Sequence, residues 1–255
     1  MRVDPRGDEE LLAAGLSSIG VLAADVYDEI AAPGWRTASR LPGARSAIVL
    51  GAGGRTFGAA LARSPEAAAG LDPVDRYTRR VVGSYLERVA EAGASARAGF
   101  YWEQCDGAFL DFVALGVRAG LGVPGRLGVL LHPEFGPWLA LRAVVLCSAE
   151  LAPTPPLGDF APCRGCAAPC AVACPARALG AGDAPGELDA QRCASARLAA
   201  DGCTRACAAR RACVIGGAHA YADRDEAHYM ATVARTLRLL DSASPGQRAG
   251  FPTRG

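Results

Sequence analysis

Eight of the ten cysteines lie between residues 163 and 213, a density of thiolates typical of a metal or redox centre. A cubane iron–sulfur cluster needs four thiolates, and short spacings let one loop hold three corners while a distant cysteine supplies the fourth. The last cysteine of the first run stands before Pro175, as in the loops of two-cluster ferredoxins. The spacing therefore predicts two [4Fe–4S] clusters. The eight residues are Cys163, Cys166, Cys170, Cys174, Cys193, Cys203, Cys207 and Cys213.

The ligands divide into two sets of four. In two-cluster ferredoxins the fourth cysteine of such a run binds the other cluster. We therefore predict that the first cluster is held by what we name the first cysteine group: Cys163, Cys166, Cys170 and Cys213. The second cluster is then held by the second cysteine group: Cys174, Cys193, Cys203 and Cys207. Eight ligands for two cubanes leave no thiolate over.

Three other uses of these thiolates remain open. Disulfides need an oxidising compartment, and the charged first residues show no export signal. Two four-cysteine zinc sites would use the same residues, although zinc sites usually pair two CxxC knuckles across a longer spacer. A single cluster with four idle cysteines would suit the irregular second half, where Val214 rather than proline follows Cys213. This irregularity makes Cys203 the weakest member of the set.

The charged residues exclude several classes of function. All 27 basic residues counted as Lys or Arg are arginine, which excludes a Schiff-base lysine and a P-loop. Residues 163–213 carry seven arginines and four acids, an excess of +3 that nearly balances the charge of about −4 on eight thiolates and two cubanes. An ordinary solvated surface would look the same. The net charge of +1 gives no indication of a nucleic-acid surface.

The segment before the cysteines alternates helical and strand patterns, which predicts a layered α/β domain. A helix over 74–92 has Asp72 as its expected N-cap and Pro73 at its first position. Between the first helix and the first strand we expect a loop. The other expected elements are helices at Glu9–Leu16, 107–119 and Asp225–Leu240, strands at Ala47–Leu50 and Ala96–Tyr101, and neighbouring strands at Leu127–Leu131 and Ala143–Cys147.

These elements give three parts. An α/β domain covers residues 1–150, a stiff proline-rich linker covers 151–162, and the cysteine-bearing domain with its C-terminal helix covers 163–255. Cys105 and Cys147 stand outside the cysteine groups and are expected to pack as small apolar residues.

The order of motifs resembles epoxyqueuosine reductase, and reductive dehalogenases share the same plan. The resemblance rests on Leu41–Leu50, on Gly120-Leu121-Gly122, and on Leu127–Trp138 with its His132-Pro133-Glu134-Phe135-Gly136-Pro137 sequence, followed by the proline linker and the cysteines. It implies a nitroreductase-like domain of the cobalamin-binding type followed by a dicluster ferredoxin-like domain, and hence an oxidoreductase.

The resemblance also implies roles for individual residues. Asp106 matches in position the acid that donates a proton in epoxyqueuosine reductase, although this chain reads Asp106-Gly107-Ala108-Phe109 where the reductase has Asp-x-Ala-Pro. Glu103 is close enough to compete, and an aspartate at a helix start is more often only an N-cap. The motif residues expected near a cofactor are His132, Glu134, Phe135 and Gly136.

We therefore expect an iron–sulfur reductase that passes electrons from two [4Fe–4S] clusters to a cobalamin-type cofactor or substrate in the N-terminal domain. The alternative is a non-catalytic dicluster ferredoxin-type electron carrier. The expected partners are an electron donor such as ferredoxin or flavodoxin and a small-molecule substrate. The short chain and the altered second-cluster spacing count against transfer RNA. No run approaches the roughly 20 apolar residues of a membrane span, and we expect a cytoplasmic protein.

Overall fold

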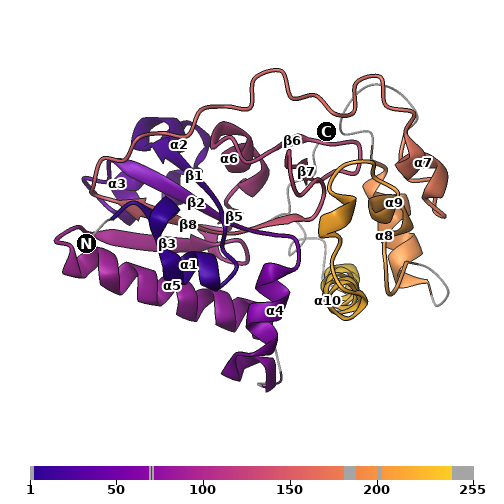
Figure 1. Ribbon diagram of the computed structural model, residues 1–255, viewed down its shortest axis with the longest axis horizontal. Helices are drawn as coiled ribbons and strands as arrows, with labels where there is room; N and C mark the ends of the chain where they lie inside the picture. The colour runs from indigo at the N-terminus through magenta and orange to yellow at the C-terminus, as the bar shows by residue number, and fades with distance from the viewer. Residues whose placement is uncertain (1–2, 69, 71, 181–187, 200–202, 243–255) are drawn as a thin grey trace. The chain divides into compact units, whose positions relative to one another are not determined.

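The computed structural model describes residues 3–68, 70, 72–180, 188–199 and 203–242 (Figure 1). The chain divides into two compact units. Unit 1 comprises Met1–Leu121 and Leu139–Gly158, and unit 2 comprises Gly122–Trp138 and Asp159–Gly255. Residues 122–138 therefore group with the cysteine-bearing part of the chain, whereas the sequence placed them in the preceding domain.

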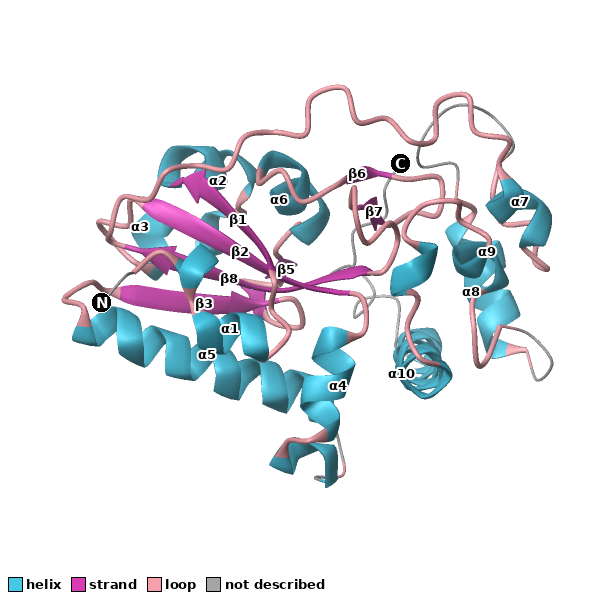
Figure 2. Ribbon diagram, in the orientation of Figure 1, coloured by secondary structure: helices cyan, strands magenta, loops and turns pink. Residues whose placement is uncertain are grey.

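Unit 1 is built on an antiparallel sheet with the strand order β1-β2-β8-β3, which has four strands among the described residues (Figure 2). The strands are β1 (Ser18–Ala23), β2 (Ser46–Gly53), β3 (Ala96–Phe100) and β8 (Leu139–Cys147). Every residue of the central strand β2 is buried. The predicted strands at Ala47–Leu50, Ala96–Tyr101 and Ala143–Cys147 are confirmed within a residue or a few of their ends.

Helices cover both faces of this sheet, because side chains alternate along a strand. Ile48 and Leu50 of β2 pack in one core cluster with Val82, while Val49 packs in the other with Trp35 and Leu115. The helices are α1 (Glu9–Ala13), α4 (Thr56–Ala62) and α5 (Pro73–Glu91) on the first face, and α2 (Ala24–Ile30), α3 (Thr37–Arg40) and α6 (Phe112–Arg118) on the second (Figure 1). Cys147 is fully buried in this core, as predicted.

Helix α5 confirms the predicted helix over 74–92. Pro73 is its first residue, and the buried face carries Tyr77, Val81 and Val89 among others. The expected cap is wrong: Asp72 has φ 51° and its side chain makes no capping hydrogen bond to the helix.

The prediction of a loop between the first helix and the strand at Ala47–Leu50 is wrong, because that segment forms β1, α2 and α3. β1 reads Ser-Ile-Gly-Val-Leu-Ala, in which Ser18 and Gly20 interrupt the apolar residues, and the strand is covered on both faces. The first helix ends at Ala13 rather than Leu16, because Gly15 at φ 82° terminates it.

The expected helix at 107–119 begins only at Phe112. Residues before it form a hairpin of β4 (Gln104–Cys105) and β5 (Ala108–Phe109). Its two-residue turn is Asp106-Gly107, both at positive φ, which is the pattern of a type I′ turn. Asp111 then caps α6 by accepting hydrogen bonds from the amides of Val113 and Ala114. Asp106 is therefore a turn residue and not an N-cap.

Unit 2 contains short elements joined by loops. The strands β6 (Val123–Pro124) and β7 (Leu130–Leu131) pair with each other. The expected pairing of Leu127–Leu131 with Ala143–Cys147 is therefore wrong, because Gly125 and Gly128 close a turn that returns the chain to β6. The helices are α7 (Pro169–Ala173), α8 (Ala190–Leu198), α9 (Ala208–Arg211) and α10 (Asp223–Ser242). Helix α10 confirms the predicted helix at Asp225–Leu240.

The proline-rich segment has no helix or strand within the described residues 151–162. Thr154 nevertheless fastens it to the edge of β1: its amide donates to the Val21 carbonyl at 2.9 Å and its Oγ1 accepts from the Val21 amide at 3.0 Å. In the part of the chain that the structure describes, no helix combines the length and apolarity needed to cross a membrane.

Candidate metal centre

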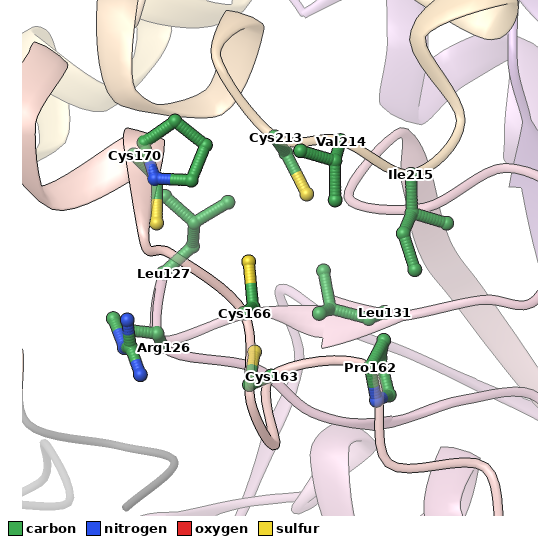
Figure 3. Close-up of a pocket in the computed structure, with 11 residues that line it drawn as sticks. Arg126, Leu127, Leu131, Pro162, Cys163, Cys166, Cys170, Cys213, Val214 and Ile215 are labelled. Atoms are coloured by element: carbon green, nitrogen blue, oxygen red, sulfur yellow. The ribbon is translucent and has the colours of Figure 1, made fainter. Parts of the chain in front are cut away.

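The first cysteine group lines one pocket of unit 2. Figure 3 shows the sulfur atoms of Cys163, Cys166, Cys170 and Cys213 turned toward a common space. Cys163 and Cys166 lie in the loop after the linker, Cys170 lies in α7, and Cys213 follows the end of α9. Residues 43 positions apart in sequence therefore meet in one pocket.

The local chain conformation explains how three of these thiols converge. The amide of Cys166 donates to the carbonyl of Cys163 at 3.4 Å, which folds the first two cysteines into a turn. Ala168 adopts a left-handed conformation at φ 54°, and Pro169 then starts α7. Cys170 thus follows the sharp reversal directly.

The remaining wall of the pocket is mostly apolar. It includes Leu127 and Leu131 from the β6–β7 hairpin, and Val214 and Ile215 after Cys213. Arg126 also lines it and is 2% exposed. Burial raises the pKa of the Cys170 thiol, and the Arg126 guanidinium partly offsets this rise. A buried cation beside four thiols favours the thiolate form that metal binding requires.

The second cysteine group gathers elsewhere in unit 2. Cys174 ends α7, Cys193 lies in α8, and Cys207 precedes α9. The amide of Cys203 donates to the Ala196 carbonyl of α8 at 3.3 Å. Burial raises the pKa of Cys203, and the nearby thiols of the other three members of the group add to the rise.

Two sets of interacting thiols result. Burial raises the pKa of Cys213, and the thiols of Cys170, Cys163 and Cys166 contribute to the rise. These are the members of the first cysteine group, whereas the thiols around Cys203 are those of the second. Four thiolates per set are a donor set suited to iron–sulfur clusters or zinc. Within the described ranges, no three His, Cys, Asp or Glu side chains converge tightly enough to hold a single metal ion.

Two charged residues lie beside the second cysteine group: Glu226, which no sequence pattern singled out, and Arg197, which stood out in the sequence only as one of seven arginines in residues 163–213. Glu226 of α10 is fully buried, and its Oε1 accepts a hydrogen bond from the Cys207 amide at 2.9 Å. Arg197 of α8 is half-buried and stands four residues after Cys193 in the same helix, near its thiol. Glu226 stands four residues before Met230 on the apolar face of the predicted helix. A carboxylate on an apolar helix face is unusual, and this position could have indicated from the sequence that Glu226 has a buried partner.

Arg210 ties α9 to the segment 122–138. Its Nε and Nη2 donate to the Pro137 carbonyl at 3.0 and 2.5 Å. Its guanidinium also lies over the rings of Trp138 and Tyr221, at 4.5 and 4.8 Å from their centres. Because α9 lies between Cys207 and Cys213, this contact helps to position one ligand of each group.

The motif residues expected near a cofactor form a compact loop. Nδ1 of His132 accepts hydrogen bonds from the amides of Glu134 and Phe135, at 3.1 and 3.2 Å, and the His132 ring stacks on Phe135. Gly136 packs so closely on Ile215 that a Cβ would lie 2.2 Å from its carbonyl oxygen. The side chain of Glu134 is the exposed one, at 62%. The loop shape is thus fixed within unit 2, and its contact with a cofactor stays a prediction.

The candidate acid lies in unit 1. Asp106 is exposed at the tip of the β4–β5 hairpin, with its carboxylate against the backbone of Gly34. Glu103 is engaged otherwise: it accepts a hydrogen bond from the Phe100 amide at 3.2 Å and pairs with Arg79 at 3.4 Å. Of the two carboxylates, Asp106 is therefore more available to a substrate. The half-buried Cys105 donates to the Gly34 carbonyl at 3.2 Å.

Part of the chain is similar in sequence to epoxyqueuosine reductases and reductive dehalogenases. No protein-family model matches the chain. An epoxyqueuosine reductase of Lactococcus garvieae is 40% identical over 89 residues, which are 35% of this chain and 23% of that protein. A tetrachloroethene reductive dehalogenase of Desulfitobacterium hafniense is 37% identical over 99 residues, 38% of this chain and 18% of the enzyme. The matched segments thus span about a quarter or less of these relatives.

Solved structures extend the likeness to most of the chain. The selenomethionine-labelled epoxyqueuosine reductase has a TM-score of 0.55 at 17% identity, covering 88% of this chain and 69% of that one. The enzyme from Bacillus subtilis has a TM-score of 0.54 at 19% identity, covering 87% and 68%. A reductive dehalogenase in complex with 3-bromo-4-hydroxybenzoic acid has a TM-score of 0.50 at 14% identity, covering 89% and 34%.

The chain is a mixed α/β protein whose fold is similar to those of epoxyqueuosine reductases and reductive dehalogenases. The resemblance drawn from its motifs is therefore confirmed, both by local sequence identity and by fold.

Proposed function

We propose that the protein is an iron–sulfur reductase that carries two [4Fe–4S] clusters in unit 2. Its electrons pass to a cobalamin-type cofactor or directly to a small-molecule substrate held by unit 1. One observation carries the proposal: eight thiols from separated parts of the sequence gather into two sets of four. Two sets of four thiolates match the ligand demand of two cubanes, with no cysteine of either set left over.

Bound clusters would supply one-electron storage and transfer. The residues of the chain provide the rest. The thiolates hold the iron, and Arg126 places a buried positive charge at the first cysteine group. Leu127, Leu131 and Ile215 give the thiolates apolar neighbours, which lowers the local polarity and strengthens electrostatic interactions there.

The proposal of a cobalamin-type cofactor rests on the similarity to epoxyqueuosine reductases and reductive dehalogenases. The loop of His132, Glu134, Phe135 and Gly136 is the candidate contact, because its backbone is fixed and Glu134 is exposed. Asp106 is the candidate proton donor. Replacing a halogen by hydrogen takes two electrons and one proton and releases halide, whereas removing an oxygen takes two electrons and two protons and releases water, one of these protons going to the leaving oxygen. The electron donor would be a ferredoxin or flavodoxin.

Metal analysis tests the cluster part of this proposal. Anaerobically reconstituted protein should contain about eight iron and about eight sulfide per chain. A value near four, or stoichiometric zinc, would overturn it. For the cofactor, the same protein mixed with cob(II)alamin should give the absorption spectrum of a bound, base-off species. An unchanged spectrum would leave an electron carrier without cobalamin chemistry.

A further inference from the structure

Two opposite charges lie at the second cysteine group on neighbouring helices. Arg197 comes from α8 and Glu226 from α10, and these helices pack against each other. Nη1 of Arg197 contacts Sδ of the buried Met230 on α10 at 3.4 Å, so the guanidinium is held near that helix. Both charges belong to unit 2, as the thiols do.

Arg197 acts on Cys193 through helix geometry. The two residues are four positions apart in α8 and therefore share a face. The guanidinium lies near the Cys193 thiol and within electrostatic range of Cys207. A cluster held there would gain negative charge on reduction, and a neighbouring cation stabilises that added charge.

Glu226 acts on Cys207 in the opposite sense. Its Oε1 accepts from the Cys207 amide at 2.9 Å and its Oε2 from Nε of Arg211 at 2.7 Å. The carboxylate is fully buried, so water screens its charge little, while the ion pair with the 41% exposed Arg211 at 2.6 Å offsets part of that charge. It also occupies an amide that would otherwise be available to donate to cluster sulfur. Both the charge and the lost donor disfavour the reduced cluster.

We propose that Arg197 and Glu226 set the reduction potential of a [4Fe–4S] cluster in the second cysteine group, Arg197 raising it and Glu226 lowering it. This inference rests on the proposed function, since it requires that cluster. The reduction it concerns is a one-electron addition to the cluster, with dithionite as the reductant and no bond made or broken.

The test is a redox titration of reconstituted protein followed by electron paramagnetic resonance. Arg197→Gln should move the potential of one cluster to a more negative value. Glu226→Gln, which keeps an acceptor for the Cys207 amide, should move the potential of the same cluster to a more positive value. The other cluster should keep its potential in both variants.

Two exposed charged residues close to Arg197 and Glu226 in the fold serve as matched controls. Arg192 adjoins Cys193 but its side chain is 59% exposed, and Asp223 pairs with Arg211 at 2.7 Å but is 92% exposed. Arg192→Gln and Asp223→Asn should leave both potentials unchanged, because solvent screens these charges. Arg197→Lys should retain most of the wild-type potential, because it keeps the positive charge.

The outcomes separate the inference from the function on which it rests. If wild-type protein lacks a second cluster by iron analysis, the proposed function fails. If both clusters are present, shifts of the same sign for Arg197→Gln and Glu226→Gln, or no shift, overturn the inference. Should Glu226→Gln lose iron, the Arg197→Gln and Arg197→Lys pair decides: equal potentials in these two variants would also overturn it.

Discussion

The guanidinium carbon of Arg210 lies 4.5 Å from the centre of the Trp138 ring. Arg210 is 8% exposed and gives two hydrogen bonds to the Pro137 carbonyl. We expect Arg210→Met to lower the free energy of unfolding by about 3 kcal/mol, because it removes a desolvated cation–π contact and leaves a carbonyl without its donors. Denaturant unfolding of the reconstituted protein measures the change.

The control for that substitution is Arg224→Met in α10. Arg224 is exposed, so its replacement should change the unfolding free energy by less than about 0.5 kcal/mol. Equal effects of the two substitutions would contradict the role of Arg210.

Cys203 is the member of the second cysteine group with the least regular spacing, yet the other three thiols of that group lie near enough to raise its pKa. Replacement by serine should remove one cluster, lowering the iron content from about eight to about four per chain. Cys105→Ser, outside both groups, should retain about eight. Retention of eight iron atoms by Cys203→Ser would show that another ligand completes the second cluster.

Arg177 has φ 49°, a conformation that costs a residue with a Cβ about 1 kcal/mol. We expect Arg177→Gly to stabilise the protein by about 0.5 kcal/mol, after allowing for the greater freedom of glycine in the unfolded chain. Arg192→Gly, a second exposed arginine that lies inside α8, should instead destabilise it by about 1 kcal/mol. Thermal unfolding of both variants checks the opposite signs, and equal signs would exclude backbone strain at Arg177.

Asp106 occupies a left-handed turn position that asparagine also tolerates. Asp106→Asn should therefore fold and bind cofactor as the wild type does, while single-turnover reduction slows by at least about a hundredfold, because the general acid is lost. Glu103→Gln should keep its turnover, although it weakens the pair with Arg79. The reverse result would transfer the proton-donor role to Glu103.

Burial lowers the pKa of His132 below its ordinary value of 6.5, with His219 adding to the effect and Glu134 opposing it. The unfolded chain therefore binds a proton more readily than the folded one, so stability is present above that value and is lost as the pH falls through it. Protonation would also remove the Nδ1 acceptor of the Glu134 and Phe135 amides.

The unfolding free energy should thus fall between about pH 7.5 and about pH 5. His132→Asn keeps a side-chain acceptor without the titration and should reduce this slope. Denaturant unfolding measured at several pH values across this range gives the slope, with His228→Asn, at an exposed position, as the control. A slope unchanged in His132→Asn would assign the titration to another group.

The eight closely spaced cysteines can be read from the sequence, because spacing is a property of the chain itself, and their role as cluster ligands stays a prediction. The sheet strands were predictable where apolar runs were isolated, as at Ala47–Leu50, but β1 was missed because Ser18 and Gly20 interrupt its apolar pattern. The hairpin at Asp106-Gly107 carried a recognisable turn signal, which the helical interpretation of the following residues overrode.

Contacts between distant segments could not be predicted from local pattern. Glu226 has the composition of a solvated helix residue, and only its partners 15 and 19 positions earlier, Arg211 and Cys207, account for its burial. In the same way, the packing of Gly136 on Ile215 assigns residues 122–138 to unit 2. Such pairings depend on the tertiary fold, and no periodicity records them.

Helices α7 and α9 both connect the first cysteine group to the second. Each is a single turn or little more, each leads from a member of one cysteine group to a member of the other, and the two helices pack together. Cys170 and Cys174 are joined by four residue steps, and even a fully extended chain of that length reaches only about 14 Å. The two cysteine groups are thus held close together by secondary structure within unit 2. If both groups hold clusters as proposed, electrons would pass from one to the other through residues of unit 2 alone.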